Sequence, residues 1–248
     1  MARHFLALDG AAVIATPLFE LTQRAVADIV AADAMGVVEG APGLGKTFSV
    51  DCAVTGNPTH ALCWVQFTGR VTPNDVAAEL LGAVTGIPHD DTLRRMREQL
   101  RRELAARRCL VVVDEAQQLT KDAIEFLRWL WDDPRSSFPL LLVGGHGCWQ
   151  VLSSKPMLRS RIHRRVSFRP LTASELRIII PRYHPIYRNI TAERILEIDE
   201  QFAHGQFRAW AEFTHSASQL CRENRLATIS DGVVDAVFAL HAQAACLA

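Results

Sequence analysis

The sequence is short of lysine and has no long apolar run. Lysine occurs only at positions 46, 121 and 155, although lysine and arginine together number 27 and balance 27 acidic residues. A net charge of +0 argues against indiscriminate polyanion binding by the whole surface, but it leaves room for a local basic stripe. No stretch approaches the roughly 18 uninterrupted apolar residues that a membrane span requires. We therefore expect a cytoplasmic protein with no membrane partner.

Metal-ligand and disulfide patterns are also missing. The six cysteines include no C-x-x-C pair, and the nine histidines show no H-E-x-x-H spacing. Most cysteines have apolar neighbours, as in Leu62-Cys63-Trp64, so we expect buried free thiols and no protein-held zinc. With 248 residues, 49% of them hydrophobic and 22% charged, the chain is long enough for a globular domain plus a smaller one.

A glycine-rich segment carries the strongest signal. Residues 40–47, Gly-Ala-Pro-Gly-Leu-Gly-Lys-Thr, match G-x-x-x-x-G-K-[ST] at every fixed position and follow the apolar run Met35-Gly36-Val37-Val38. At this spacing, backbone N–H groups close around phosphates, Lys46 reaches the β- and γ-phosphates, and the Thr47 hydroxyl binds Mg²⁺. A helix starting near Lys46 adds partial positive charge. The predicted nucleotide-binding residues here are Gly40, Pro42, Gly43, Leu44, Gly45, Lys46, Thr47 and Phe48.

A second motif supports the first. The apolar run Val111-Val112-Val113 ends in Asp114 and Glu115. Asp114 stands where a carboxylate holds Mg²⁺ through water, and Glu115 where a base polarises the attacking water. Two adjacent carboxylates favour hydrolysis over kinase-type transfer. The alternative is a strand that happens to end in two acids before a helix.

Apolar patterns predict strands alternating with helices up to residue 170, which implies βαβ units and a parallel sheet flanked by helices. After Arg169-Pro170-Leu171 only helical patterns remain. We therefore predict an α/β nucleotide-binding domain over residues 1–170 and a small all-α domain over 171–248. The expected strands are 35–38, 61–67, 109–114, 140–143 and 166–168, and the expected helices are 17–31, 73–84, 92–108, 121–132, 173–182, 191–203, 206–223 and 230–243.

In these features the chain resembles the AAA+ ATPases, and within them the cluster of the transposition regulators MuB, TnsC and TniB and the secretion ATPase ExeA. The resemblance covers about residues 15–243, and only its first two motifs are specific. The segments that carry it are Gly40 to Thr47, Val113-Asp114-Glu115-Ala116-Gln117, Phe126-Leu127-Arg128, Leu141-Leu142-Val143-Gly144, Leu158-Arg159-Ser160-Arg161-Ile162, Pro170-Leu171-Thr172 and Gly205-Gln206-Phe207-Arg208.

The resemblance implies a P-loop AAA+ core with a helical lid, working as a ring or helical filament of identical subunits. ATP and Mg²⁺ would be bound between neighbours, and no guanine-reading N-K-x-D motif appears. The expected partners are further copies of the chain, duplex DNA and an integrase-type transposase, with a role in regulating transposition. Arg161 would be the arginine finger of the neighbouring site, with Arg159 as the alternative, and Arg208 would be the lid arginine that contacts nucleotide.

One departure concerns the end of the strand at 140–143. AAA+ proteins commonly place Asn, Ser or Thr after it, whereas this chain has Gly144-Gly145-His146-Gly147. Either His146 takes this sensor role from a shifted position, or the sensor is absent. We expect nucleotide binding more firmly than efficient hydrolysis, and slow turnover would suit a switch.

The segment from about 92 to 108 is rich in arginine. On a helix, Arg94, Arg97, Arg101 and Arg108 fall on one side, beside an apolar stripe. Such a row is suited to meet backbone phosphates without reading bases, which predicts non-specific DNA binding. The alternative is a solvated helix face balanced by nearby acids.

Two other functions remain open at this point. The chain could serve another assembly, of the export or helicase-loader type. It could also be a nucleotide-dependent signalling switch that scarcely hydrolyses ATP, for which the Gly144-Gly145 departure is the motivation.

Overall fold

The computed structural model describes residues 8–56, 59–135 and 137–245. Contacts divide the chain into two compact units. The first, the sheet unit, comprises residues 17–42 and 46–168; the second, the helical unit, comprises the described residues up to Thr16, Gly43–Gly45 and those from Arg169 onward. The sequence-based division at residue 170 stays a prediction about independent domains.

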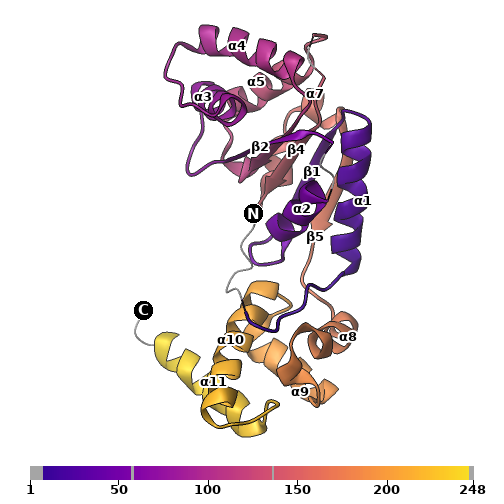
Figure 1. Ribbon diagram of the computed structural model, residues 1–248, viewed down its shortest axis with the longest axis vertical. Helices are drawn as coiled ribbons and strands as arrows, with labels where there is room; N and C mark the ends of the chain where they lie inside the picture. Colours follow the sequence, from indigo (N-terminus) through magenta and orange to yellow (C-terminus); the bar gives the residue numbers. More distant parts are fainter. Residues whose placement is uncertain (1–7, 57–58, 136, 246–248) are drawn as a thin grey trace. The chain divides into compact units, whose positions relative to one another are not determined.

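The sheet unit is built on five parallel strands (Figure 1). Their order is β2-β3-β4-β1-β5, so β4 lies between β1 and β3 although it follows both in the chain. Parallel strands cannot be joined by tight turns, and the intervening helices provide the crossovers. This confirms the predicted fold class. The strands are β1 (Met35–Gly40), β2 (Ala61–Gln66), β3 (Cys109–Asp114), β4 (Leu140–Gly144) and β5 (Ile162–Phe168).

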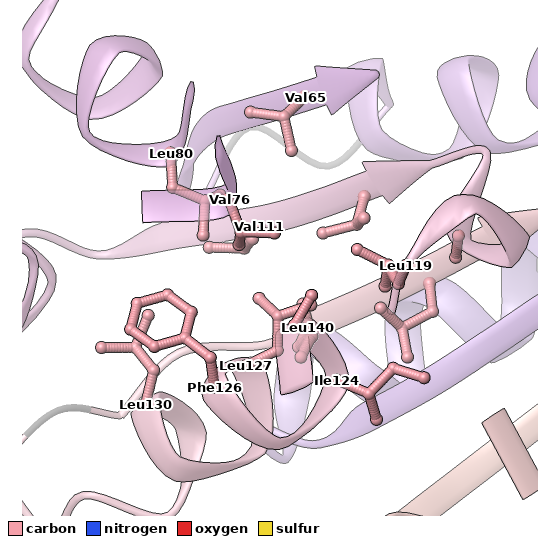
Figure 2. Close-up of a cluster of buried hydrophobic side chains, with 14 of the residues drawn as sticks. Val65, Val76, Leu80, Val111, Leu119, Ile124, Phe126, Leu127, Leu130 and Leu140 are labelled. Carbon is pink, nitrogen blue, oxygen red and sulfur yellow. The ribbon is translucent and has the colours of Figure 1, made fainter. Parts of the chain in front are cut away.

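Helices cover both faces of the sheet, which is why the inner strands are continuously apolar. On β3, Val111 points into a cluster with side chains of α3 and α5 (Figure 2). Val113 and the buried residues of α4 belong to the same cluster. Val112 between them is buried on the opposite face, where α1 and α2 pack against β1. The helices of this unit are α1 (Pro17–Ala31), α2 (Lys46–Thr55), α3 (Pro73–Thr85), α4 (Leu93–Ala106), α5 (Lys121–Trp131), α6 (Cys148–Ser153), α7 (Pro156–Arg159) and the 3-10 turn η1 (Ala116–Gln118).

Local sequence signals set several helix ends. Thr72 and Asp75 form a reciprocal capping box at the start of α3, with Pro73 in its first turn, and Gly86 ends the helix at φ 79°. These devices satisfy backbone groups that a helix end otherwise leaves without partners.

The helical unit has its own core around Trp210 and Phe213 of α10, with the buried Tyr187 hydroxyl 2.8 Å from Thr214 Oγ1. Asp199 Oδ1 accepts hydrogen bonds from Trp210 Nε1 at 3.0 Å and from the backbone N–H of Gly205 at 2.7 Å. The elements of this unit are α8 (Ala173–Tyr183), the 3-10 turn η2 (Pro185–Tyr187), α9 (Ala192–Ile198), the π turn η3 (Asp199–Ala203), α10 (Phe207–Glu223) and α11 (Asp231–Ala245).

The start of one strand, the end of one helix and two short helices differ from expectation. Strand β5 starts at Ile162, four residues earlier than predicted, because its first half carries no apolar run: His163, Arg164 and Arg165 are exposed on this edge strand. Helix α4 ends at Ala106, since Arg107 is already extended at φ −126°. The short helices α6 and α7 were not predicted at all.

The five described cysteines are free thiols, as expected. Burial raises the pKa of Cys63 and of Cys148 to about 12. The sixth, Cys246, lies outside the described residues. None of the helices in the described ranges combines the length and apolar character needed to span a bilayer.

Candidate nucleotide-binding site

The loop between β1 and α2 has a backbone shape that depends on glycine. Gly40, Gly43 and Gly45 have φ of 146°, 80° and 90°, values that residues with a Cβ rarely adopt. Gly40 also lies against β5, where a Cβ would meet the carbonyl oxygen of Phe168 at 2.6 Å. The loop runs directly into the start of α2, and the backbone N–H groups and dipole at a helix start suit a phosphate group.

Lys46 begins α2 and curls back over this loop. Its side chain is buried, and Nζ donates a hydrogen bond to the carbonyl oxygen of Ala41 at 2.8 Å. The ammonium group is thereby held in the curve of the loop, where the outer phosphates of a nucleotide would lie. Among the other predicted residues, Leu44 is buried, Pro42 is exposed and Phe48 is half-buried.

Asp114 ends β3 and faces the exposed Thr47. Its Oδ2 accepts a hydrogen bond from Thr47 Oγ1 at 3.4 Å, and its Oδ1 accepts one from the backbone N–H of Glu115 at 2.8 Å. Burial raises the pKa of Asp114 above its ordinary value; the charge of Glu115 acts in the same direction and that of Lys46 against it. The hydroxyl oxygen of Thr47 and the carboxylate of the buried Asp114 fit Mg²⁺, which takes oxygen ligands and completes its shell with water and phosphate.

Glu115 follows in a left-handed conformation, with φ 57° and ψ 40°. Its Oε2 accepts a hydrogen bond from Nε2 of Gln117 in η1. The Oε1 of Gln117 in turn accepts a hydrogen bond from the backbone N–H of Gly145 at 2.7 Å. The predicted base is therefore linked through Gln117 to the end of β4.

Sequence reasoning gave Gln117 no role. It lay inside one of the segments that carry the resemblance, but a glutamine two positions after an acid pair has no spacing signal of its own. His146, the suggested sensor, is exposed and makes no hydrogen bond within the described ranges. The polar side chain found at the end of β4 is that of Gln117.

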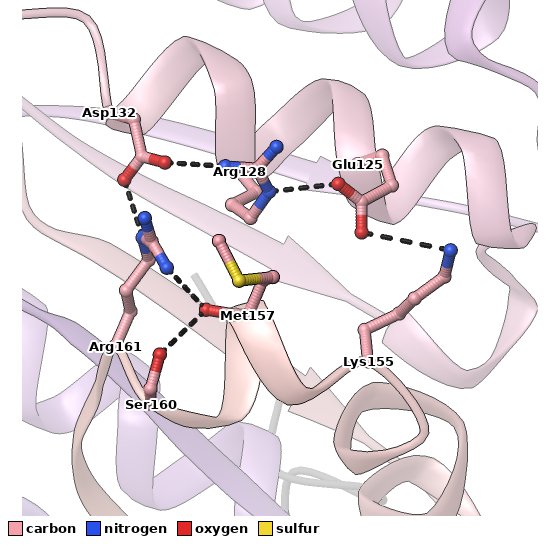
Figure 3. A network of polar contacts seen from close by, with 7 residues as sticks. All are labelled: Glu125, Arg128, Asp132, Lys155, Met157, Ser160 and Arg161. Atoms are coloured by element: carbon pink, nitrogen blue, oxygen red, sulfur yellow. Dashed lines mark hydrogen bonds and ion pairs between the residues drawn. The ribbon is translucent and has the colours of Figure 1, made fainter.

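Arg161 is held by its own chain in a polar network (Figure 3). Its Nε donates to Asp132 Oδ1 at 2.6 Å and its Nη1 to the carbonyl oxygen of Met157 at 2.6 Å. Asp132 is shared with Arg128, whose Nη1 lies 2.6 Å from Oδ2. A finger that reached a neighbouring subunit would have to leave these contacts. The network comprises Glu125, Arg128, Asp132, Lys155, Met157, Ser160 and Arg161.

The other two arginines of the predicted site are exposed. Arg159 ends α7 and forms no ion pair with any residue that the structure describes. Arg208 lies in the first turn of α10 in the helical unit. The finger role of Arg161 or Arg159 and the nucleotide contact of Arg208 stay predictions.

The arginine row of α4 is shorter than predicted. Arg94 and Arg97 are exposed, with the Arg97 guanidinium 4.3 Å from the ring centroid of Trp129. Arg101 Nε instead lies 2.5 Å from Oδ2 of the buried Asp133, and this ion pair fastens α4 to the residues that follow α5. Arg101 Nη1 also lies 3.2 Å from Oε2 of Glu98 on the same helix. Arg108 lies beyond the last helical residue, so the four arginines do not share one helix face. That prediction of a single row was wrong, because α4 ends early and Arg101 has a structural partner.

Comparisons with known proteins agree on the type of core. Residues 30–152 match the family model of the AAA domain. A search of curated proteins gives no match. In a comparison with solved structures, the chain has the fold of AAA+ ATPases. The sequence identities are below 20%, so this similarity shows the fold alone.

Three solved structures illustrate the similarity. ORC2 of Aeropyrum pernix, in ADPNP–ADP complexes, is 15% identical with a TM-score of 0.69, covering 96% of this chain and 71% of its own. The RuvB Holliday junction branch migration motor of Thermotoga maritima is 19% identical with a TM-score of 0.60, covering 89% and 68%. ORC1 of Aeropyrum pernix, in complex with DNA, is 18% identical with a TM-score of 0.66, covering 91% and 65%.

The burial of Asp114 generates a prediction about stability. Because ionised Asp114 is poorly solvated, Asp114→Asn should raise the free energy of unfolding in EDTA, by roughly 0.5–2 kcal/mol. The same change should abolish the extra stabilisation that Mg²⁺ and ATP give the wild type, since binding to the native state alone stabilises it. Thermal and urea unfolding, each with and without Mg-ATP, measure both effects. The control is Asp122→Asn, because Asp122 is an exposed acidic residue in the first turn of α5. A variant that kept the Mg-ATP stabilisation would contradict the assignment of Asp114.

Proposed function

We propose that this chain, a P-loop core of the AAA+ fold, is a cytoplasmic Mg²⁺-dependent ATPase that assembles on duplex DNA as a ring or filament. In this account the ATP-bound subunits bind DNA without reading its sequence, and slow hydrolysis releases them. On the resemblance to MuB, TnsC and TniB, we extend the proposal to regulation of transposition with an integrase-type transposase as partner.

The observation that carries the proposal is the convergence of three elements on one end of the sheet. Lys46 lies in the phosphate loop after β1, Thr47 and Asp114 lie within 3.4 Å of each other, and Glu115 follows at the end of β3. A phosphate cradle, a pair of Mg²⁺ ligands and an adjacent carboxylate base are the parts that ATP hydrolysis requires.

Each residue then has a definite task. The loop N–H groups and Lys46 bind and orient the outer phosphates, and Lys46 leaves the Ala41 carbonyl to do so. Thr47 and Asp114 hold Mg²⁺, which offsets the charge of the phosphate oxygens when bound. Glu115 accepts a proton from the water that attacks the γ-phosphate. Because negative charge lies on the phosphoryl and leaving oxygens in the transition state, an arginine from a neighbour would accelerate hydrolysis by stabilising that charge.

The proposals of oligomerisation and DNA binding rest on the resemblance and on exposed arginines of the sheet unit. Arg161 and Arg159 stand just before β5, on the sequence segment that resembles an arginine finger, and Arg159 is exposed. Arg94 and Arg97 remain the candidates on α4 for phosphate contact. The solved structures of similar fold include one in complex with DNA and one branch migration motor.

A second function, a nucleotide switch with scarcely any turnover, is favoured by one observation. Glu115 accepts a hydrogen bond from Gln117, and the loop after β4 offers glycines where AAA+ proteins place a polar side chain. A wild-type protein that binds Mg-ATP tightly but shows no turnover, alone or with DNA, would favour the switch over the ATPase.

The DNA-binding proposal predicts a dependence on nucleotide state. Fluorescence anisotropy of random-sequence duplexes at low salt should show binding with ATP and weak binding with ADP. Affinity should fall steeply with added salt, because phosphate contacts release counterions. Glu115→Gln should slow hydrolysis by about 10²–10⁴-fold and prolong the lifetime of the DNA complex in ATP.

Lys46→Ala is the matched control, since it should lose both nucleotide binding and DNA binding. Equal affinity for two unrelated duplexes is expected of binding without base readout. No DNA affinity in ATP at low salt would overturn this part of the proposal.

The finger assignment predicts complementation between subunits. Arg161→Ala should bind ATP like the wild type but lose cooperative hydrolysis, because its neighbour's site lacks the arginine. Mixing it with Glu115→Gln should restore part of the turnover, since the second variant supplies an intact finger to an intact site. Steady-state hydrolysis across mixing ratios measures this, with Arg159→Ala as the alternative. A variant that lost ATP binding and hydrolysis equally, with no recovery on mixing, would exclude action in trans.

A further inference from the structure

The end of β4 is placed where a side chain can act on the reacting water. Its neighbours are β1, which leads into the phosphate loop, and β3, which leads into Asp114 and Glu115. The chain has Gly144 and Gly145 at this point. A polar group there would have to come from another element.

Packing accounts for the first glycine. A Cβ on Gly144 would collide with Sγ of Cys148 and would lie 2.7 Å from Oε1 of Gln117. The Cys148 thiol is fully buried, so it has little room to withdraw. The space that a sensor side chain would need is therefore already filled, in part by Gln117.

The orientation of the Gln117 amide follows from its two partners. Oε1 accepts from the backbone N–H of Gly145, a group that can only donate. The NH₂ group must then face Oε2 of Glu115, where it donates to the carboxylate. Gln117 thus connects the base to a backbone group at the end of β4, and all three residues belong to the sheet unit.

We propose that Gln117 is a positioning residue for ATP hydrolysis, which takes the place of the polar side chain that follows β4 in other AAA+ proteins. Through Gln117, the β4–α6 loop holds the Glu115 carboxylate in the direction from which it accepts the proton of the attacking water. This inference rests on the proposed ATPase function. Its distinguishing consequence is that Gln117 affects turnover and leaves ATP binding unchanged.

The test compares Gln117→Ala with Gln118→Ala, a matched control whose side chain makes no hydrogen bond within the described ranges. Binding of a fluorescent ATP analogue and steady-state hydrolysis are measured on the full chain. For Gln117→Ala we expect kcat to fall by up to about 100-fold, since a small misplacement of a catalytic group has an effect of this size. The dissociation constant for the ATP analogue should stay within about twofold of the wild-type value, because Gln117 does not touch the phosphate loop. For Gln118→Ala both values should match the wild type.

Two further variants separate positioning from a structural effect. Gln117→Glu keeps the size and can still accept from Gly145, but it cannot donate to Glu115 when ionised, so its kcat should also fall. Adding Gly145→Ser to Gln117→Ala restores a polar side chain at the end of β4 and should recover part of the turnover. The added side chain has room, because the three atoms nearest to a Cβ on Gly145 all belong to Gln117.

The outcomes are distinguishable from those of the proposed function. A wild type that hydrolyses no ATP would overturn the ATPase proposal and this inference together. A wild type that turns over, with Gln117→Ala or Gln117→Glu equally active, would overturn the inference alone. A loss of ATP binding that matches the loss of turnover, without recovery by Gly145→Ser, would assign Gln117 a structural role instead.

Discussion

The order of the parallel strands is the constraint on which the site depends. Because the strands are parallel, their carboxyl ends lie at one edge of the sheet, and the order places the end of β4 between those of β1 and β3. Elements far apart in the chain thereby contribute a phosphate loop, an acid pair and a backbone N–H donor to one small region. Helices on both faces hold these strand ends in place. The site is therefore more rigid than one built from loops alone.

Electrostatics at this edge are arranged for a ligand more than for stability. Asp114 is buried beside Glu115, and burial raises the pKa of Asp114, so its charge is poorly compensated by the protein itself. Lys46 is turned toward a loop carbonyl, and in the proposed function it changes partner when nucleotide binds. Arg161 lies at the opposite edge of the sheet, just before β5, where it is engaged with Asp132. If it acts as a finger, it has to leave Asp132 to reach a neighbouring subunit.

Much of this could be predicted from the sequence. Residues 40–47 and 109–115 have fixed spacings with a direct physical meaning, and continuous apolar runs identified the inner strands. The predictions failed where contacts between distant parts of the chain determine the structure. Ion pairing of Arg101 with Asp133 removed Arg101 from the expected arginine row, and the exposed polar residues in the first half of β5 hid the start of that strand. Gln117 could not be assigned, because its role exists only once β4 lies beside β3.

The most direct test of the central claim is a crystal structure with Mg²⁺ and a non-hydrolysable ATP analogue. The account predicts the phosphates in the loop at Gly43–Thr47, Lys46 on the outer phosphates instead of on Ala41, and Mg²⁺ at Thr47 with Asp114 in its immediate surroundings. It also predicts Gln117 still between Glu115 and Gly145. Nucleotide bound elsewhere, or Lys46 still on the Ala41 carbonyl with phosphates in place, would contradict it.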